Sequence, residues 1–99
     1  MKAEAVFREK RAVLNPKTGQ LGIAEIRFWK VPRSEHYSEG RKFSLFLACE
    51  GKILIGIDNH KPKGPHLHSG NEEVRFDYSG DEQLLNEFWE LVRKAGFEP

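Results

Sequence analysis

Histidines are concentrated in one short polar segment of the chain, between residues 58 and 68. Three of its four histidines, His60, His66 and His68, fall within nine residues, and Asp58 precedes the first by two positions. Imidazole exchanges protons near neutral pH and also binds metals, so it serves either acid–base or metal chemistry. Side chains two apart in an extended chain project to one side, so His66 can converge with His68 and Asp58 with His60. We therefore predict the functional site here, at the end of a strand.

One interpretation of this segment is metal-independent cleavage of RNA. One histidine would take a proton from a ribose 2′-hydroxyl while another donates a proton to the leaving oxygen, and Asp58 would orient a histidine. Lys61 and Lys63 would stabilise charge on the phosphate. RNA carries its own nucleophile, so this chemistry needs little enclosure and suits a small protein. Arg41 and Lys42 are candidates for further phosphate contacts, and Trp29 either stacks on a base or packs against the sheet.

Two other interpretations remain open for the same segment. Its histidines and aspartate provide three or four nitrogen and oxygen ligands, enough for zinc, nickel or manganese, and the set would be Asp58, His60, His66 and His68. Alternatively the segment is a solvated loop in which the histidines are incidental. The first of these predicts a metal-dependent hydrolase and the second leaves no chemistry.

The composition limits the kind of protein. The 99 residues contain one cysteine, Cys49, which excludes an internal disulfide framework and a four-thiolate zinc site. Cys49 lies in an apolar run and is expected to be a buried thiol. No apolar run approaches the roughly 20 residues of a membrane span, and the N-terminus begins no signal-peptide pattern. A cytoplasmic protein without a membrane partner is expected.

Charge is distributed unevenly along the chain despite a net charge of +1. Residues 1–42 contain ten Lys and Arg against five Asp and Glu, whereas residues 69–99 contain three against eight. The basic N-terminal part suggests an anionic partner such as RNA, and the acidic C-terminal part suggests a basic partner. The two parts can also neutralise each other within the fold.

Period-two alternation of apolar residues predicts strands, and one three-to-four spacing predicts a helix. The helix starts near Asp81, with capping-box spacing of Ser79 and Glu82, and ends at Gly96. The fold predicted is α+β: an antiparallel sheet of about five strands, two hairpins plus one strand, packed against one C-terminal helix in a single domain, 1–99. The predicted strands are Ala3–Leu14, Ile23–Val31, Phe43–Glu50, Ile53–Ile57 and Glu73–Tyr78.

The order of these features resembles the TumE-like toxins of bacterial and archaeal toxin–antitoxin pairs. The resemblance lies in Arg41-Lys42-Phe43-Ser44-Leu45, in Gly56-Ile57-Asp58-Asn59 and in Pro65-His66-Leu67-His68, with an aromatic strand and one amphipathic helix after them. It implies a ribonuclease with a helix-turn-helix antitoxin as its partner. It also implies a site of Asp58, His66 and His68, with His60 and the Arg41/Lys42 pair nearby. Phe43 stands where a tyrosine is common in that family.

The function predicted from the sequence is a type II toxin that cleaves RNA without a metal, through acid–base catalysis by the loop histidines. The alternatives are a non-catalytic module that binds nucleic acid or protein through the same loop, and a metal-dependent hydrolase. Exposed edge strands would also permit a homodimer formed through the sheet.

Overall fold

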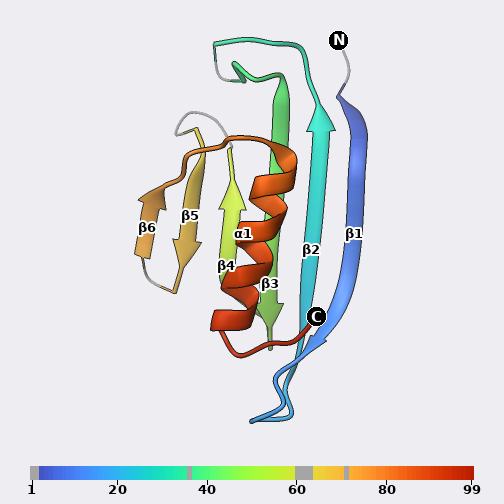
Figure 1. Ribbon diagram of the computed structural model, residues 1–99, viewed down its shortest axis with the longest axis vertical. Helices are drawn as coiled ribbons and strands as arrows, with labels where there is room; N and C mark the ends of the chain where they lie inside the picture. The colour runs from blue at the N-terminus through green and yellow to red at the C-terminus, as the bar shows by residue number, and fades with distance from the viewer. Residues whose placement is uncertain (1–2, 36, 60–63, 71) are drawn as a thin grey trace.

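The computed structural model describes residues 3–35, 37–59, 64–70 and 72–99. Within these residues it contains one antiparallel sheet, whose strands lie side by side in chain order, and one helix (Figure 1). The predicted α+β class is confirmed, with six strands where about five were predicted. The elements are β1 (Glu4–Leu14), β2 (Leu21–Lys30), β3 (Arg41–Cys49), β4 (Lys52–Asp58), β5 (His66–Ser69), β6 (Glu72–Arg75) and α1 (Asp81–Lys94).

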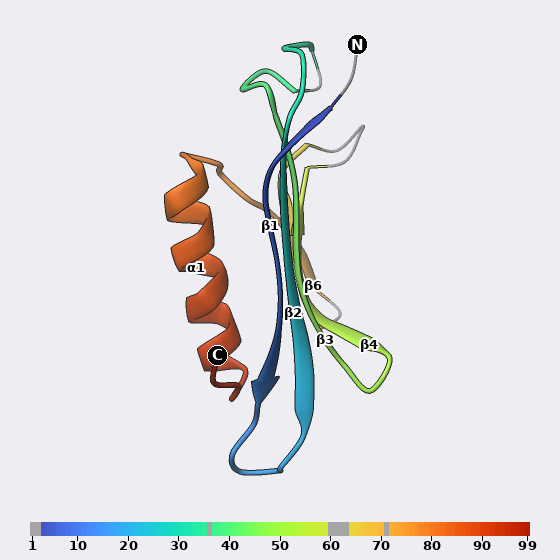
Figure 2. The same ribbon diagram turned by 90° about the vertical axis from the view of Figure 1, so that its right-hand side faces the viewer.

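The helix α1 lies along one face of the sheet, and no other described element covers the opposite face (Figure 2). Apolar residues alternate along the strands and meet the apolar stripe of α1, as predicted. Fully burying one such side chain contributes roughly 1.5–3 kcal/mol, so this single interface supplies the main stabilisation of the fold. Its largest members are Ile26, Phe28, Phe43, Leu45, Leu47, Ile57, Leu84, Phe88 and Val92.

The face of the sheet opposite α1 carries the residues that alternate with this core, and we call it the open face. Neighbouring strands are all antiparallel, so residues paired in the register project to the same face. Polar side chains dominate it, together with the aromatic rings of Trp29 and Phe46, whereas the core face is apolar. Its main members are Arg8, Arg27, Trp29, Lys42, Ser44, Phe46, Gly56, Asp58, His66, His68, Glu73 and Arg75.

The end of the sheet differs from the prediction. The sequence predicts a polar loop over residues 58–68, whereas Asp58 ends β4 and His66–Ser69 forms β5, which pairs with both β4 and β6. The predicted strand Glu73–Tyr78 is shorter than expected, because β6 ends at Arg75. Pro65 explains this boundary: it has no N–H for the ladder, and its carbonyl accepts the N–H of Phe76 as the chain leaves the sheet.

The helix begins differently from the prediction but ends as predicted. Gly80 is the N-cap residue and no side chain caps the helix, so the predicted Ser79 capping box is wrong; the Ser79 hydroxyl bonds to Gln83 instead. Gly80 has φ 124°, a backbone geometry that L side chains rarely adopt. Gly96, with φ 96°, ends the helix as expected. No helix in the described part of the chain is long and apolar enough to cross a membrane.

The β3–β4 hairpin bends away from α1, toward the open side of the sheet (Figure 2). Its turn has positive φ at both Glu50 and Gly51, as a two-residue type I′ turn requires. A register shift between Leu47 and Ala48 marks a bulge, and bulges increase the local bend and twist of a strand. Cys49, the last residue of β3, is buried as predicted. The bend makes the open face concave beside β4.

Candidate functional site

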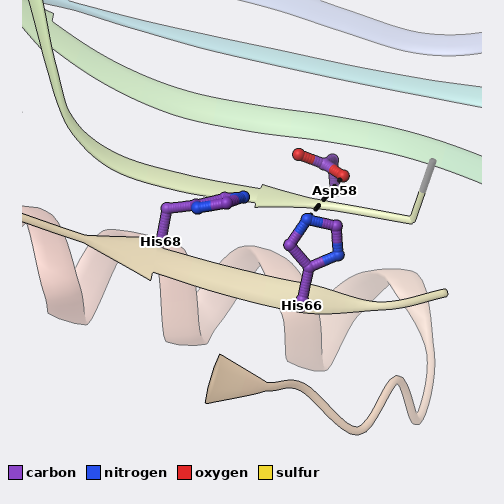
Figure 3. A group of neighbouring side chains, drawn as sticks. All are labelled: Asp58, His66 and His68. Atoms are coloured by element: carbon purple, nitrogen blue, oxygen red, sulfur yellow. Dashed lines mark ion pairs between the residues drawn. The ribbon is translucent and has the colours of Figure 1, made fainter. Parts of the chain in front are cut away.

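Three of the predicted site residues meet on the open face. Asp58 ends β4, and the register places it opposite His66 on β5, with His68 two residues further along (Figure 3). The Nε2 atom of His66 lies 3.4 Å from Oδ1 of Asp58. The His66 and His68 rings meet edge to face, with centroids 4.6 Å apart. The predicted convergence of the two histidines is thus confirmed, while the partner of Asp58 is His66 across the strands; the other expected partner, His60, lies outside the described residues.

Glu73 on β6 is a fourth member of the cluster that the sequence analysis did not identify. The register places it opposite His68. Its Oε2 atom lies 3.5 Å from Nε2 of His66 and 3.5 Å from Nε2 of His68. The only sequence signal for it was alternation along the last strand. The cluster therefore consists of two imidazoles held between two carboxylates.

The orientation of the His66 ring follows from its other nitrogen. Nδ1 lies 2.7 Å from the carbonyl oxygen of Gly64, and because a carbonyl only accepts, Nδ1 carries the proton. In the neutral ring the lone pair is then on Nε2, which faces the carboxylates. The His66 side chain is 11% exposed and that of His68 is 43% exposed, so His68 is the more accessible imidazole.

Asn59 fixes the end of β4 and therefore the position of Asp58. Its buried amide accepts a hydrogen bond from the N–H of Phe43 at 2.9 Å and donates one to the carbonyl of Arg41 at 2.8 Å. These bonds continue the β3–β4 pairing by one residue beyond Asp58, which is opposite Ser44. The two neighbouring residues thus have different roles: Asn59 anchors the backbone, and Asp58 directs its carboxylate toward His66.

The predicted phosphate-binding residues are separated by the sheet. Lys42 lies on the open face, with Nζ 5.6 Å from the centre of the Trp29 ring. Arg41 lies on the face covered by α1, where its guanidinium pairs with Asp81 at 3.3 Å. Lys61 and Lys63, like His60, lie outside the described residues. Of Arg41 and Lys42, only Lys42 therefore lies on the open face with the two histidines.

A row of facing residues crosses all six strands through the cluster. Successive register pairs link Arg8 to Arg27, Arg27 to Ser44, Ser44 to Asp58, Asp58 to His66 and His66 to Arg75. The guanidinium of Arg27 is also paired with Glu25. Three arginines therefore share a row with the cluster, on both sides of it. No spacing in the sequence indicated this, because the three lie on different strands.

A hollow of about 360 Å³ borders the cluster on the open face. Asp58 and His68 form one side of it, and Phe46 and Ser44 of β3 form another. Gly56 lies between Phe46 and His68 in the register and has no side chain to fill the space. The remaining lining residues are Leu45, Ile53, Ile57 and Gly70.

Tyr78 anchors the start of α1 near the same end of the sheet. Its ring stacks on Phe43 with centroids 5.2 Å apart, and its hydroxyl donates to Asp81, the partner of Arg41. Partial burial, with a further contribution from Asp81, raises the pKa of Tyr78 from 10.0 to about 12. Phe43 and Tyr78 thus form a stacked aromatic pair. The phenol of this pair belongs to Tyr78, whereas residue 43, where the family commonly has a tyrosine, is a phenylalanine.

The raised pKa of Tyr78 predicts a loss of stability at alkaline pH. The folded protein holds this proton more tightly than the unfolded chain, so the stabilisation is complete below about pH 10 and is lost as the pH rises toward about 12. Urea unfolding at pH values across this window measures the effect. Tyr78→Phe is expected to flatten that part of the stability curve, and a variant as steeply pH-dependent as the wild type would contradict the assignment.

The cluster supports two kinds of chemistry. Two imidazoles and two carboxylates on an accessible face can exchange protons with a bound substrate. Equally, one ligand atom from each of Asp58, His66 and His68 lies within 4.8 Å of the others, which is close enough to bind one metal ion. Both uses place the reacting group at the same point of the open face.

The family model for toxin TumE matches residues 3–95. The chain belongs to the TumE toxin family. The match spans β1 to the end of α1, so it includes every residue of the cluster and of the row. Comparison with curated proteins and with solved structures gives no match. Membership of a toxin family suggests an antitoxin partner.

Proposed function

We propose that this TumE-family toxin is a metal-independent endoribonuclease of a type II toxin–antitoxin pair, with His66 and His68 as its acid–base pair. The observation that carries the proposal is the convergence of both imidazoles, flanked by Asp58 and Glu73, on an accessible sheet face. A shallow site suffices, because RNA supplies its own 2′-hydroxyl nucleophile.

The proposed reaction is a transesterification within the RNA chain. One imidazole removes the proton of a 2′-hydroxyl, and that oxygen attacks the adjacent phosphorus. The bond from phosphorus to the 5′-oxygen breaks, and the second imidazole protonates the leaving oxygen. The products are a 2′,3′-cyclic phosphate and a 5′-hydroxyl end. His68 is the more exposed ring and takes the 2′-hydroxyl proton. His66 enters the step doubly protonated, keeps its Nδ1 proton on Gly64 and gives its Nε2 proton to the leaving oxygen.

The cationic side chains have distinct parts in this proposal. Lys42 on the open face, together with Lys61 and Lys63 as predicted from the sequence, would contact phosphates. Arg41 is left out of the site, because its ion pair with Asp81 holds it on the face covered by α1. Asp58 and Glu73 would orient the two imidazoles. His60, predicted as a further catalytic candidate, keeps that place in the proposal.

The proposed partner is a helix-turn-helix antitoxin, and the proposed location is the cytoplasm. The acidic last third of the chain is a docking surface for a basic segment of that antitoxin. The proposal includes a homodimer through an edge strand, because β1 carries the exposed apolar residues Val6 and Phe7 and β6 carries Val74.

A metal-dependent hydrolase is the second candidate function. Metal–ligand distances of roughly 2.0–2.2 Å in a tetrahedral site require ligand separations of roughly 3.3–3.6 Å. The imidazole–carboxylate separations of 3.4 and 3.5 Å in the cluster fall in that range. The bond from His66 Nδ1 to Gly64 is also the kind of outer contact that orients metal-binding histidines. Asp58, His66 and His68 would be the ligands, with His60 as the fourth ligand predicted from the sequence.

Incubation of the purified protein with end-labelled RNA, with and without EDTA, separates these candidates. The proposed function predicts cleavage that persists in EDTA and leaves cyclic phosphate ends. Cleavage that EDTA abolishes, and that added Zn²⁺ or Mn²⁺ restores, would establish the metal-dependent hydrolase instead. RNA that is retarded on a native gel but stays intact would leave the non-catalytic binding module.

A further inference from the structure

The hollow beside the cluster is open above Gly56, which has no side chain to fill it. Gly56 lies in the middle of β4 and is flanked in the register by Phe46 on one side and His68 on the other. Glycine in a strand interior weakens the strand, because it loses more backbone freedom on folding and offers no side chain to pack. Because glycine lowers the stability of this strand, we look for a functional reason for its presence at position 56.

The fold itself does not require glycine here. The backbone of Gly56 is outside the positive-φ region that favours glycine. A Cβ atom placed on it would lie 3.7 Å from Cγ2 of Ile53 and 4.0 Å from Cβ of His68, which are ordinary van der Waals distances. What a larger side chain would do is fill the hollow of about 360 Å³. Glycine at position 56 is therefore explained by the open hollow that it preserves and not by a backbone conformation that only glycine adopts.

The walls of the hollow suit a flat heterocycle. Phe46 provides a half-buried aromatic ring, Ser44 provides a hydroxyl, and His68 links the hollow to the cluster. Bases bind proteins by stacking on aromatic side chains while polar groups contact their edges. A base in this hollow would place its own ribose and phosphate beside His68.

The charges next to the hollow favour a polyanion. Arg8 and Arg27 stand directly opposite each other on β1 and β2, and Glu25 pairs with the guanidinium of Arg27. Two arginines against this one carboxylate keep the spot positively charged, which attracts an anion. A second, smaller hollow of about 100 Å³ lies between them and Trp29. Both arginines share the row that runs through Ser44 to Asp58 and His66. Phosphates bound along this row would continue the chain of a nucleotide whose base occupies the larger hollow.

We infer that the hollow over Gly56 is a nucleobase pocket, and that single-stranded RNA crosses the strands with its phosphates along the arginine row. The inference rests on the proposed function, since it identifies the nucleotide next to the scissile phosphate. It adds the binding residues Phe46, Gly56, Arg8 and Arg27, which neither the motif nor the cluster contains.

Binding of uncleavable RNA tests the pocket. The probes are 2′-O-methyl hexamers of adenosine and of uridine, which lack the nucleophile, and an abasic hexamer with the same phosphates. The wild type is expected to bind at least one base-containing hexamer about tenfold more tightly than the abasic one, as for one stacked base. Gly56→Val is expected to abolish this preference while retaining the affinity for the abasic hexamer.

Matched variants separate loss of the pocket from loss of the fold. Ala12→Val adds a β-branched side chain at an exposed position on the same face, opposite Ile23, and is expected to keep the preference. Gly56→Val should unfold at the same or a higher temperature, because valine favours strands. Phe46→Leu removes the aromatic wall without filling the space, and should also reduce the preference.

The possible outcomes distinguish the pocket from the proposed nuclease. A wild type without base preference, or Gly56→Val and Phe46→Leu variants that both keep the wild-type preference, would overturn the pocket. If unmodified RNA is still cleaved in either case, the nuclease proposal stands without it. A base preference that Gly56→Val abolishes, in a wild type that cleaves no RNA, would support the pocket and overturn the nuclease.

Discussion

His68→Gln is expected to lower the rate constant of RNA cleavage by about 10²–10⁴-fold, the contribution of a well-placed general acid or base. The His68 side chain is 43% exposed, so a glutamine fits there with little change in stability. Its amide is polar but does not exchange a proton near neutral pH. The loss should therefore appear in kcat, with KM nearly unchanged. Steady-state cleavage of labelled RNA in EDTA measures both constants.

His66→Asn tests the second imidazole with its structural contact preserved. The asparagine amide can still donate to the carbonyl of Gly64, which His66 Nδ1 contacts at 2.7 Å, but it lacks the reactive Nε2. Its kcat should fall by a similar factor, and the double variant should fall little further, because residues that act as a unit are not additive. Glu72→Gln, on the exposed edge strand, is the matched control. Wild-type kcat in both histidine variants would reject them as acid and base.

Asn59→Ala is expected to lower the free energy of unfolding by about 2–4 kcal/mol, because each buried group left without a partner costs about 1–3 kcal/mol. The N–H of Phe43 and the carbonyl of Arg41 both lose their bonds to Asn59. Phe43 is 1% exposed, so water does not easily replace the missing acceptor. The free energy is measured from urea unfolding curves.

Asn86→Ala provides the matched control for Asn59. Asn86 lies on the exposed side of α1, and alanine favours helices there, so its free energy of unfolding should change little or rise slightly. Cleavage should fall in Asn59→Ala even under conditions where it remains folded, because the end of β4 no longer fixes Asp58. A change of less than about 0.5 kcal/mol in Asn59→Ala, typical of surface positions, would contradict the anchoring role.

Local periodicity was enough to predict most elements of this fold. Alternation in β2 and β3 places Ile26, Phe28, Leu45 and Leu47 on one face of the sheet, and the apolar stripe on α1 matches that face. Such patterns are encoded by consecutive residues and need no knowledge of partners. β5 consists of three polar residues and Leu67, and this is too short a segment for alternation to predict a strand. They form a strand because both β4 and β6 supply hydrogen-bond partners, and that depends on pairing between strands.

The candidate site, too, was predictable in part from local spacing and in part depends on pairing between strands. The spacing of His66 and His68 by itself determined that the two rings share one side of an extended chain, and Asp58 at a strand end was apparent from the sequence. Only the tertiary structure decided which residues join them. Cross-strand register brings Glu73 to both histidines, lines up Arg8, Arg27 and Arg75 with the cluster, and sends Arg41 to the face covered by α1. The physical reason is that side-chain direction is set locally by strand periodicity, whereas contact between strands is set by turns, bulges and pairing far apart in the chain.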